Sequence, residues 1–326
     1  MTGLKDIREA RQTIGSRLHR TPIVGSATLS RMAGCPAWLK LENFQKTGSF
    51  KPRGAFNNIM GIEPGLRARG VITISAGNHA QGVAWAASQV GIPSVVVMPE
   101  TASAAKADAA RGYGAHVVQH GDIAAAFAKL EELRAETGMT YVHAFDDEAT
   151  IAGQGTVGLE IAEDLPDVER VILGIGGGGL IAGVAVALKE SLPAVRIIGV
   201  EPTGADSMMR SRAKGAPVRL EKIDTIADGL AAPFAGERTF AIVQKYVDDL
   251  VLVDDDEIRG GMRFLLKRCK VLAEPAGAAA TAALLSGRAG AGGRTLVIVS
   301  GGNVAPGVLG ELLSRPGAAF PSSFSS

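Results

Sequence analysis

The sequence predicts an α/β fold in which parallel β-sheets are covered by helices on both faces. Short runs rich in Val, Ile and Leu alternate with Ala-rich helical stretches along almost the whole chain. These runs are apolar throughout instead of alternating with polar residues, which is typical of strands buried on both faces. The chain has 326 residues, which is long for one average domain and favours two lobes.

The individual elements follow from the same pattern. Eight short β-branched runs are expected to be strands: 37–41, 71–75, 94–98, 116–119, 170–175, 196–200, 250–253 and 295–300. Longer stretches between them, rich in Ala and other helix formers, are expected to be helices, among them 80–90, 104–111, 123–136, 180–191, 255–269 and 276–285. Ligands of such sheets bind beyond the carboxyl ends of the strands, in the loops that open the next helix.

Composition narrows the class of protein. Hydrophobic residues make up 46% and charged residues 21%, and the formal net charge is +1, the balance of an ordinary globular protein. No basic stripe suggests a nucleic-acid partner. No apolar stretch suggests a membrane span, and no leader-like segment opens the chain, so the cytoplasm is the expected location. The two cysteines, Cys35 and Cys269, match no metal or redox spacing and are expected to be reduced packing residues.

A glycine run follows one predicted strand. Gly174-Ile175-Gly176-Gly177-Gly178-Gly179 satisfies G-x-G-x-x-G, and the next strand ends near Glu201. Taken alone, this segment is compatible with an NAD-dependent oxidoreductase whose acid binds the ribose. Backbone N–H groups at a helix start bind any phosphate, however. The run therefore predicts a phosphate site without specifying which phosphate.

A lysine lies in an unusual loop at 43–54. Ser49 is expected to cap a helix and Pro52 suits its first turn, so Lys51 would stand at a helix start. The positive end of the helix dipole disfavours a protonated lysine there. A lysine with a depressed pKa is a nucleophile for carbonyl groups. An isolated lysine is more often a solvated surface residue, as we expect for Lys46.

Four segments together resemble one family. Lys46 to Ala55 resembles the cofactor-lysine motif of fold type II pyridoxal-phosphate enzymes, specifically the serine/threonine dehydratase (threonine ammonia-lyase) and serine racemase family. Residues 75–82 resemble its substrate-carboxylate loop, 176–179 its phosphate cup and 300–303 its pyridine-nitrogen loop. The similarity runs from about residue 7 to 307. The resemblance implies a tryptophan synthase beta-like fold and bound pyridoxal 5′-phosphate.

The resemblance also implies residue roles. Lys51 would hold the cofactor and act as the catalytic base, Phe50 would lie beside the ring, and Asn78 would bind the ring hydroxyl. A neutral Ser300 facing the pyridine nitrogen favours elimination over transamination, because a hydroxyl keeps the ring a weaker electron sink than a carboxylate would. His79 is a candidate general base, although capping or ring packing is favoured. The remaining ligands implied are Gly176, Gly177, Gly178, Gly179 and Leu180 for the phosphate, and Ser75, Ala76, Gly77, Asn78 and His79 for the substrate carboxylate.

One position separates dehydratase from racemase. In serine racemases a serine before the Gly of the S-G-N-H loop serves as the second acid or base, and Ala76 occupies that position here. A dehydratase acting on L-threonine or L-serine, with products 2-oxobutanoate or pyruvate and ammonia, is therefore the favoured function. Serine racemase and threo-3-hydroxyaspartate dehydratase remain alternatives. An NAD-dependent oxidoreductase and a non-catalytic cofactor-binding protein are more distant ones.

Several acids have open roles. Racemase-like members bind a divalent ion at an E-P-x-x-A/G-x-D segment, in which Glu201 and Ala205 match and Ser207 replaces the acid, so a metal site stays undecided. Glu274 could face the cofactor or serve as a helix-start carboxylate. Asp146 and Asp147 could line the substrate entrance or be solvated loop acids.

The resemblance implies the domain division as well. A large discontinuous cofactor-binding lobe is expected at 1–50 and 146–326, with a small inserted lobe at 51–145 and the cofactor between them. A homodimer or homotetramer is the usual assembly of the family. The short stretch after residue 303 is not expected to hold the regulatory domain of biosynthetic threonine dehydratases.

Overall fold

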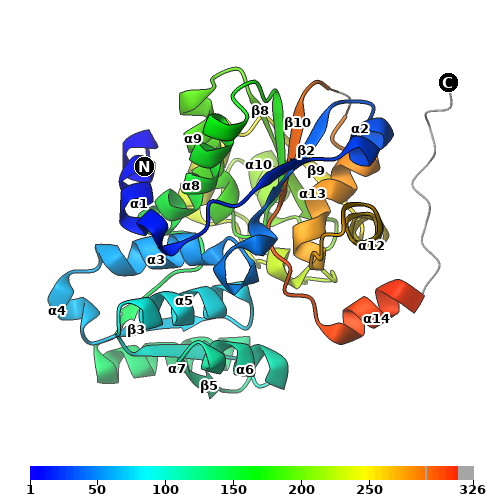
Figure 1. Ribbon diagram of the computed structural model, residues 1–326. Helices are drawn as coiled ribbons and strands as arrows, with labels where there is room; N and C mark the ends of the chain where they lie inside the picture. The colour runs from blue at the N-terminus through cyan, green and yellow to red at the C-terminus, as the bar shows by residue number, and fades with distance from the viewer. Residues whose placement is uncertain (291, 315–326) are drawn as a thin grey trace.

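The chain folds around two separate β-sheets, as the computed structural model shows (Figure 1). The structure describes residues 1–290 and 292–314; the Gly- and Ser-containing tail from residue 315, which the sequence suggests is mobile, lies outside the described residues. Both sheets are built mainly from parallel strands covered by helices, so the α/β prediction is confirmed.

The larger sheet has six strands in the order β1-β2-β10-β7-β8-β9. All neighbours are parallel except β1, which pairs antiparallel with β2 at the edge. Side chains alternate between the two faces of β10: Val297 and Val299 join one core cluster, whereas Leu296 and Ile298 join another. The strands are β1 (Ile23–Gly25), β2 (Ala37–Leu41), β7 (Arg170–Gly174), β8 (Arg196–Pro202), β9 (Asp249–Val253) and β10 (Thr295–Val299).

The smaller sheet has four parallel strands in the order β5-β4-β3-β6. Helices α5 and α6 cover one face of it, and α7 covers the other. Its strands are β3 (Val71–Ile74), β4 (Ser94–Met98), β5 (His116–Gln119) and β6 (Thr140–Tyr141).

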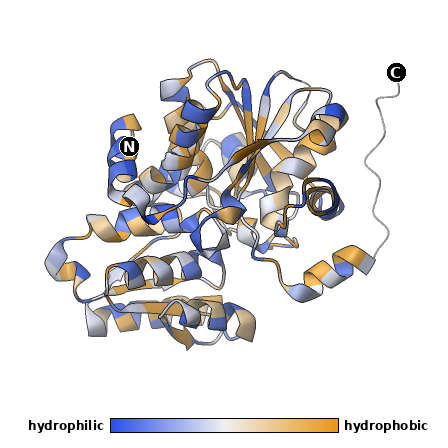
Figure 2. Cartoon of the chain, viewed as in Figure 1, coloured by the Kyte–Doolittle hydropathy of each residue, from blue (hydrophilic) through white to orange (hydrophobic). Residues whose placement is uncertain are grey.

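The helices enclose these sheets, so that apolar strands lie inside and helices of mixed polarity outside (Figure 2). In the described residues none of them is both long and apolar enough to cross a membrane. They are α1 (Leu4–Ile14), α2 (Ala27–Ala33), α3 (Lys51–Gly61), α4 (Pro64–Arg67), α5 (Asn78–Gln89), α6 (Ala104–Gly112), α7 (Ile123–Thr137), α8 (Glu148–Asp164), α9 (Gly179–Ser191), α10 (Ser207–Lys214), α11 (Glu237–Tyr246), α12 (Asp255–Phe264), α13 (Pro275–Leu285) and α14 (Pro306–Ser314).

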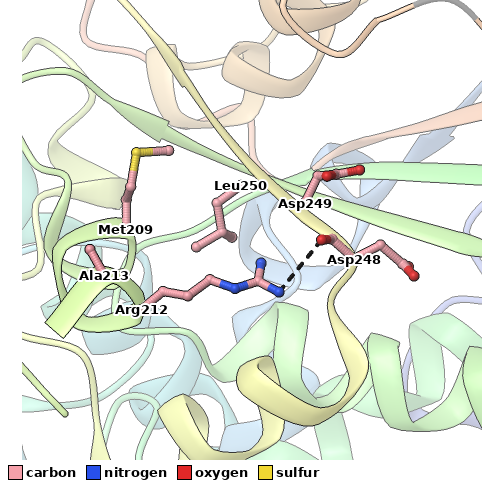
Figure 3. A pocket seen from close by; sticks show the side chains of 6 residues that line it. All are labelled: Met209, Arg212, Ala213, Asp248, Asp249 and Leu250. Atoms are coloured by element: carbon pink, nitrogen blue, oxygen red, sulfur yellow. Dashed lines mark hydrogen bonds between the residues drawn. The ribbon is translucent and has the colours of Figure 1, made fainter. Parts of the chain in front are cut away.

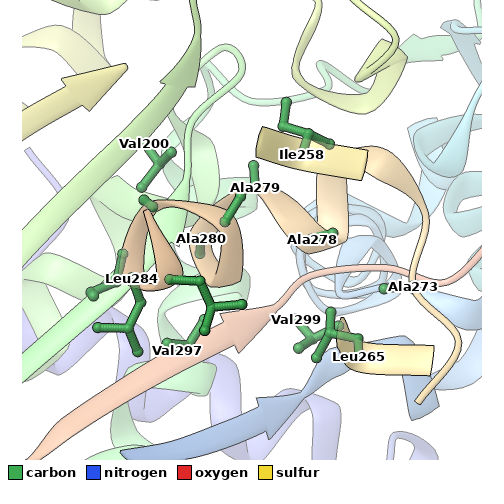
Figure 4. Close-up of a cluster of buried hydrophobic side chains, with 14 of the residues drawn as sticks. Val200, Ile258, Leu265, Ala273, Ala278, Ala279, Ala280, Leu284, Val297 and Val299 are labelled. Atoms are coloured by element: carbon green, nitrogen blue, oxygen red, sulfur yellow. The ribbon is translucent and has the colours of Figure 1, made fainter. Parts of the chain in front are cut away.

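Helix α13 is the centre of the larger core. All eleven of its residues are buried, and small Ala side chains let neighbouring elements approach it closely. Val200 and Val297 from the sheet pack around it, together with Ile258 from α12 (Figure 4). This packing fixes the start of α13, and therefore the position of Glu274, which directly precedes it.

The structure corrects the prediction in a few places. The helix expected over 255–269 ends as α12 at Phe264 and continues as one π-helical turn, Leu265–Cys269, which Lys270 terminates with a left-handed φ of 61°. The short strands β1 and β6 were not predicted, because two or three residues give no usable periodicity. The free cysteines Cys35 and Cys269 agree with the expectation for them.

Candidate active site at Lys51

Lys51 is the first residue of α3, where the chain passes from the larger sheet to the smaller one. Pro52 follows it in the first turn, as expected. The expected cap is wrong: Phe50 occupies the N-cap position, and the Ser49 hydroxyl is buried with no partner in the described part of the chain. Ser49 is instead extended and forms an antiparallel bridge with Gly301, one residue before the cap position.

The Lys51 amine lies in a partly enclosed, mostly uncharged environment. Its Nζ donates to the carbonyl oxygen of Ala144 at 3.1 Å and lies 5.2 Å from the centre of the Phe50 ring. Burial lowers the pKa of Lys51 to about 8, while the Glu274 carboxylate acts to raise it. The expected lowering is present, and its main cause is burial. A fall from the ordinary value of about 10.4 to about 8 increases the neutral fraction at pH 7 by a factor on the order of 10².

The loop that precedes α5 lies beside this lysine. Gly77 is the N-cap residue and no side chain caps the helix, so the first-turn N–H groups of α5 have no helical acceptor. The Gly77 N–H itself donates to the Ser75 hydroxyl at 3.1 Å. The Ala76 side chain packs against the core of the smaller sheet. The loop therefore offers an anion site at the α5 start, although the Gly77 amide is already bonded.

His79 is placed poorly for a general base. Its Nε2 lies 3.0 Å from the Val142 carbonyl oxygen, which can only accept, so this nitrogen carries the proton. Burial and the charge of Lys51 lower the pKa of His79 to about 3. A neutral imidazole of such low basicity, held by a backbone carbonyl, is best described as a structural residue.

The glycine run forms the start of α9. Gly178 is the N-cap residue with a φ of 94°, a conformation that favours glycine, and α9 begins at Gly179. Phe145 packs directly on the run: a Cβ at Gly177 would lie 2.3 Å from its ring. The need for glycine is therefore partly internal packing, which the sequence did not reveal. The N–H groups at the start of α9, including that of the buried Leu180, have no side-chain cap, and such a helix terminus can bind an anion.

Residues 143–147 connect Lys51 to the glycine run. Ala144 accepts the bond from Lys51, and the next residue, Phe145, covers Gly177. His143 fixes this turn, because its Nδ1 accepts from the N–H groups of Phe145 (3.2 Å) and Asp146 (2.9 Å). Sequence reasoning missed His143 and Phe145, since neither belongs to a recognisable motif.

The two aspartates that follow accept hydrogen bonds from N–H groups at the starts of helices. Asp146 accepts from the backbone N–H groups of residues 237–239 at the start of α11. Asp147 accepts from the N–H of Thr150 at 2.8 Å and so caps α8. These helix-start bonds are a role that the sequence did not suggest for either residue.

Ser300 follows β10 and is buried. Its carbonyl oxygen accepts from the Phe50 N–H at 3.1 Å, and the Gly302 N–H donates to the Gly48 carbonyl at 2.9 Å. These two backbone bonds hold the predicted pyridine-nitrogen loop against the lysine loop. Ser300, Phe50 and Lys51 are therefore neighbours, as the motifs required.

Glu274 approaches from the start of α13 and is buried. Its carboxylate does not cap the helix; Oε1 accepts from Asn78 Nδ2 at 2.6 Å. Burial raises the pKa of Glu274 to about 8, and the bond from Asn78 opposes the rise. The Glu274 carboxylate thus faces the loop of Asn78. Of the two roles considered for Glu274, this position favours the one in which it faces the cofactor.

Comparison with known proteins decides the family. Residues 15–301 match the family described as pyridoxal-phosphate dependent enzyme. The chain belongs to this family. It is 45% identical over 316 residues to the L-threonine ammonia-lyase of Thermotoga maritima, covering 97% of this chain and 79% of the relative.

Solved structures of family members agree in fold. Maize serine racemase superposes with a TM-score of 0.91 at 39% identity, covering 96% of this chain and 97% of the racemase. The T.th. threonine deaminase gives a TM-score of 0.88 at 40% identity, covering 93% of this chain and 99% of the deaminase. The predicted fold type II architecture is confirmed. These two solved structures are similar to this chain to nearly the same degree, whereas the curated relatives at 44–46% identity are named threonine ammonia-lyase or threonine dehydratase.

The side chains of this family member fit pyridoxal phosphate. Lys51 supplies an amine with a lowered pKa, and the uncapped starts of α5 and α9 supply two sites for anionic groups. Ala144 accepts from Lys51 and Phe145 packs on Gly177, so residues 144–145 link the amine to the α9 start. An amine for the aldehyde, one helix start for the phosphate and another for a substrate carboxylate are what this chemistry requires.

The dinucleotide interpretation of the glycine run is wrong. The Glu201 carboxylate is buried and accepts from the N–H groups of Met208 and Met209, each at 2.8 Å. The carboxylate therefore binds the N–H groups at the start of α10 and is unable to reach a ribose. Burial raises the pKa of Glu201 to about 8.

The acids of the candidate metal segment are bonded to residues that follow it in α10. Asp206 pairs with Arg210 at 2.8 Å, and Ala205 is buried beside it. Among residues 1–290 and 292–314 no group of three or more His, Cys, Asp or Glu side chains is arranged to hold an ion.

A surface hollow of about 410 Å³ lies elsewhere, between α10 and β9 (Figure 3). Arg212 spans it and donates to the carbonyl oxygens of Val247 (2.8 Å) and Asp248 (3.5 Å). None of the residues predicted for catalysis lines it.

A buried ionic cluster supports the lysine loop and was also missed. Arg53, two residues after Lys51, donates to Glu42 and to Glu160 with N–O distances of 2.7–3.0 Å. Lys40 donates to Glu160 at 2.6 Å. All four side chains are nearly or fully buried. The alternation of apolar and charged residues in 40–53 was a possible signal, because buried charges require partners.

Proposed function

We propose that this chain is a dehydratase, or ammonia-lyase, that converts L-threonine, L-serine or both to 2-oxobutanoate or pyruvate and ammonia. The observation that carries the proposal is the Lys51 amine, with a pKa of about 8, beside the uncapped start of α5 and linked through Phe145 to the glycine run. The relatives named as L-threonine ammonia-lyase and threonine deaminase support the same reaction.

In this proposal the predicted residues divide the binding of cofactor and substrate among them. Lys51 would hold pyridoxal phosphate, and Phe50 and Ser300 would contact its ring. The N–H groups of Gly176 to Leu180 would bind the phosphate, and Asn78 would bind the ring oxygen. The cofactor, when bound, supplies an electron-accepting ring that stabilises negative charge at the substrate Cα.

The residues of the chain perform the proton transfer and the orientation. The α5 start, residues 75–79, binds the substrate carboxylate and so directs the Cα–H bond. Neutral Lys51 accepts the Cα proton, and the released electron pair forms a Cα=Cβ bond as hydroxide leaves Cβ and is protonated. The enamine product tautomerises and is hydrolysed to the 2-oxo acid and ammonia.

Ala76 favours elimination over racemisation. Racemisation needs a second acid or base on the opposite face of Cα, and a methyl group supplies none. Ser75 is the nearest hydroxyl in the sequence, and its oxygen accepts from the Gly77 N–H, which holds it against its own loop. Serine racemase and threo-3-hydroxyaspartate dehydratase remain the alternatives to be tested with their own substrates.

The larger organisation is proposed on the same basis. The cofactor lies between a large lobe at 1–50 and 146–326 and a small one at 51–145, whose closure would exclude water. An ion pair between Lys106 of α6 and Asp228, with Nζ and Oδ2 2.6 Å apart, already joins the two. We further propose a cytoplasmic homodimer or homotetramer.

The test combines absorption spectroscopy with product analysis. Purified protein loaded with pyridoxal phosphate should show a visible absorption band that changes on addition of L-threonine, and 2-oxobutanoate should appear. Lys51→Ala should abolish both. Lys46→Ala, a lysine of the same loop, should leave the band in place.

Two results would change the conclusion. A band without oxo-acid from threonine or serine would redirect the work to D-serine formation and to 3-hydroxyaspartate. The absence of any band in the loaded wild-type protein would refute the proposal.

A further inference from the structure

A chain of side-chain hydrogen bonds crosses the site and joins three loops. Asn303 Nδ2 donates to the carbonyl oxygen of Thr47 at 2.7 Å and to Asn78 Oδ1 at 2.8 Å. Asn78 Nδ2 then donates to Glu274 Oε1 at 2.6 Å. The chain therefore links the lysine loop, the α5 start and the start of α13, and the motif residue Asn303 has no task in the proposed function so far.

The direction of this chain is fixed by its first member. A backbone carbonyl oxygen can only accept a hydrogen bond, so the Asn303 side chain must turn its Nδ2 toward Thr47. The same nitrogen donates its second hydrogen to Asn78, which must therefore accept with its Oδ1. The orientation of the Asn78 amide is thus determined by bonding and is not an arbitrary choice between two flipped forms.

One hydrogen of the Asn78 side-chain amide is left to donate to a ligand. Its Nδ2 has two hydrogens, and one is used by Glu274. With Oδ1 occupied by Asn303, the amide can offer a further ligand only a donor. We propose that Asn303 is a positioning residue that holds Asn78 as a hydrogen-bond donor to the ring oxygen of bound pyridoxal phosphate. This inference rests on the proposed function.

The backbone conformation at Thr47 and Gly48 allows Asn303 to approach the Thr47 carbonyl oxygen. Thr47 and Gly48 both have left-handed φ angles, 61° and 72°. A Cβ at Gly48 would lie 2.5 Å from Asn303 Oδ1, so glycine is needed for the approach. A left-handed threonine costs roughly 1–3 kcal/mol and persists only where its surroundings hold it. The bond from Asn303 to the Thr47 carbonyl is one such restraint.

The experiment compares two variants with a matched control. Asn303→Ala removes the donor and the bulk, whereas Asn303→Leu removes the donor and keeps similar bulk against Gly48. Asn43→Ala is the control: Asn43 Nδ2 also donates to a carbonyl, that of Leu272, at 3.0 Å, but does not touch Asn78. For each protein the dissociation constant of pyridoxal phosphate is measured by titrating the cofactor-free form, and the pH midpoint of the visible band by spectrophotometry.

Both Asn303 variants should weaken cofactor binding by roughly 3- to 10-fold, the size expected from one hydrogen bond. Both should also raise the pH midpoint of the band. A donor to the ring oxygen draws charge from it, and without that donor the oxygen stabilises the neighbouring proton more strongly. Asn43→Ala should change neither quantity.

The proposal is overturned if Asn303→Leu binds and titrates like the wild type, or if Asn43→Ala shifts the midpoint equally. These failures are distinct from failure of the proposed function, in which the wild-type protein itself shows no band.

Discussion

Replacing Arg53 should destabilise the protein far more than replacing any surface arginine. The guanidinium is 1% exposed and makes six hydrogen bonds, four of them to the carboxylates of Glu42 and Glu160. Arg53→Met keeps an unbranched chain of similar length but leaves two buried carboxylates with only Lys40 as a cation. The buried cluster changes from net zero to one uncompensated negative charge.

The magnitude follows from that charge. Breaking a buried ion pair by removing one partner costs about 3–5 kcal/mol, because the other charge stays buried. With an unfolding entropy of about 2.1 cal/mol/K per residue over 326 residues, a loss of about 4 kcal/mol lowers the melting temperature by about 6 °C. The double variant Arg53→Met/Glu42→Gln restores neutrality, so it should be more stable than Arg53→Met alone.

Scanning calorimetry and urea unfolding of the cofactor-free proteins would measure both effects. A matched control is Arg288→Met, which removes an arginine that is 56% exposed and paired with Glu257, and such pairs contribute about 0–1 kcal/mol. The reasoning is refuted if Arg53→Met loses less than about 1 kcal/mol, or if Glu42→Gln adds to its loss instead of relieving it.

Three further predictions concern the site. Gly177→Ala places a methyl group against the Phe145 ring, so we expect at least about 10-fold weaker binding of pyridoxal phosphate, measured by titration; unchanged affinity would show that Phe145 moves freely. Burial raises the pKa of Glu274 to about 8, so ionisation of this acid destabilises the fold as the pH rises from the pKa of the unfolded chain to about 8. Over that pH range the melting temperature of Glu274→Gln should rise relative to that of the wild type. A difference in melting temperature that stays constant with pH would contradict the raised pKa. Ala76→Ser supplies the missing hydroxyl and should produce D-serine from L-serine, detected by chiral chromatography; elimination alone would mean that a serine here is not sufficient.

Sequence patterns predicted most of the fold because buried parallel strands are short, continuous and apolar. The strands 37–41, 94–98 and 116–119 have the predicted boundaries. The antiparallel edge strand β1 and the two-residue strand β6 depend on their neighbours for their conformation, so local patterns could not reveal them. The π-helical turn after Phe264 has the same explanation, since it continues an ordinary helical sequence.

The site was predictable only where a motif carried it. The lysine loop, the α5 loop, the glycine run and the serine loop lie together around Lys51 as expected. The residues between motifs were not predictable: Phe145 packs on the glycine run and Glu274 bonds Asn78 across almost two hundred positions of sequence. The helix-start bonds of Asp146 and Asp147 were not predictable, because their partners are known only once α8 and α11 are placed.

The hydrogen bond between Lys51 and Ala144 also has a mechanical meaning. The chain passes between the two sheets twice, once through α3 at Lys51 and once after β6 at residues 142–147, and this bond joins the two crossings (Figure 1). A rotation of the smaller sheet about these crossings would leave the lysine close to the axis, where displacement is least. The Lys106–Asp228 pair, one of several further bonds between the two lobes, would open and close. The reactive amine would then keep its place at the boundary of the two lobes while the walls around the substrate move.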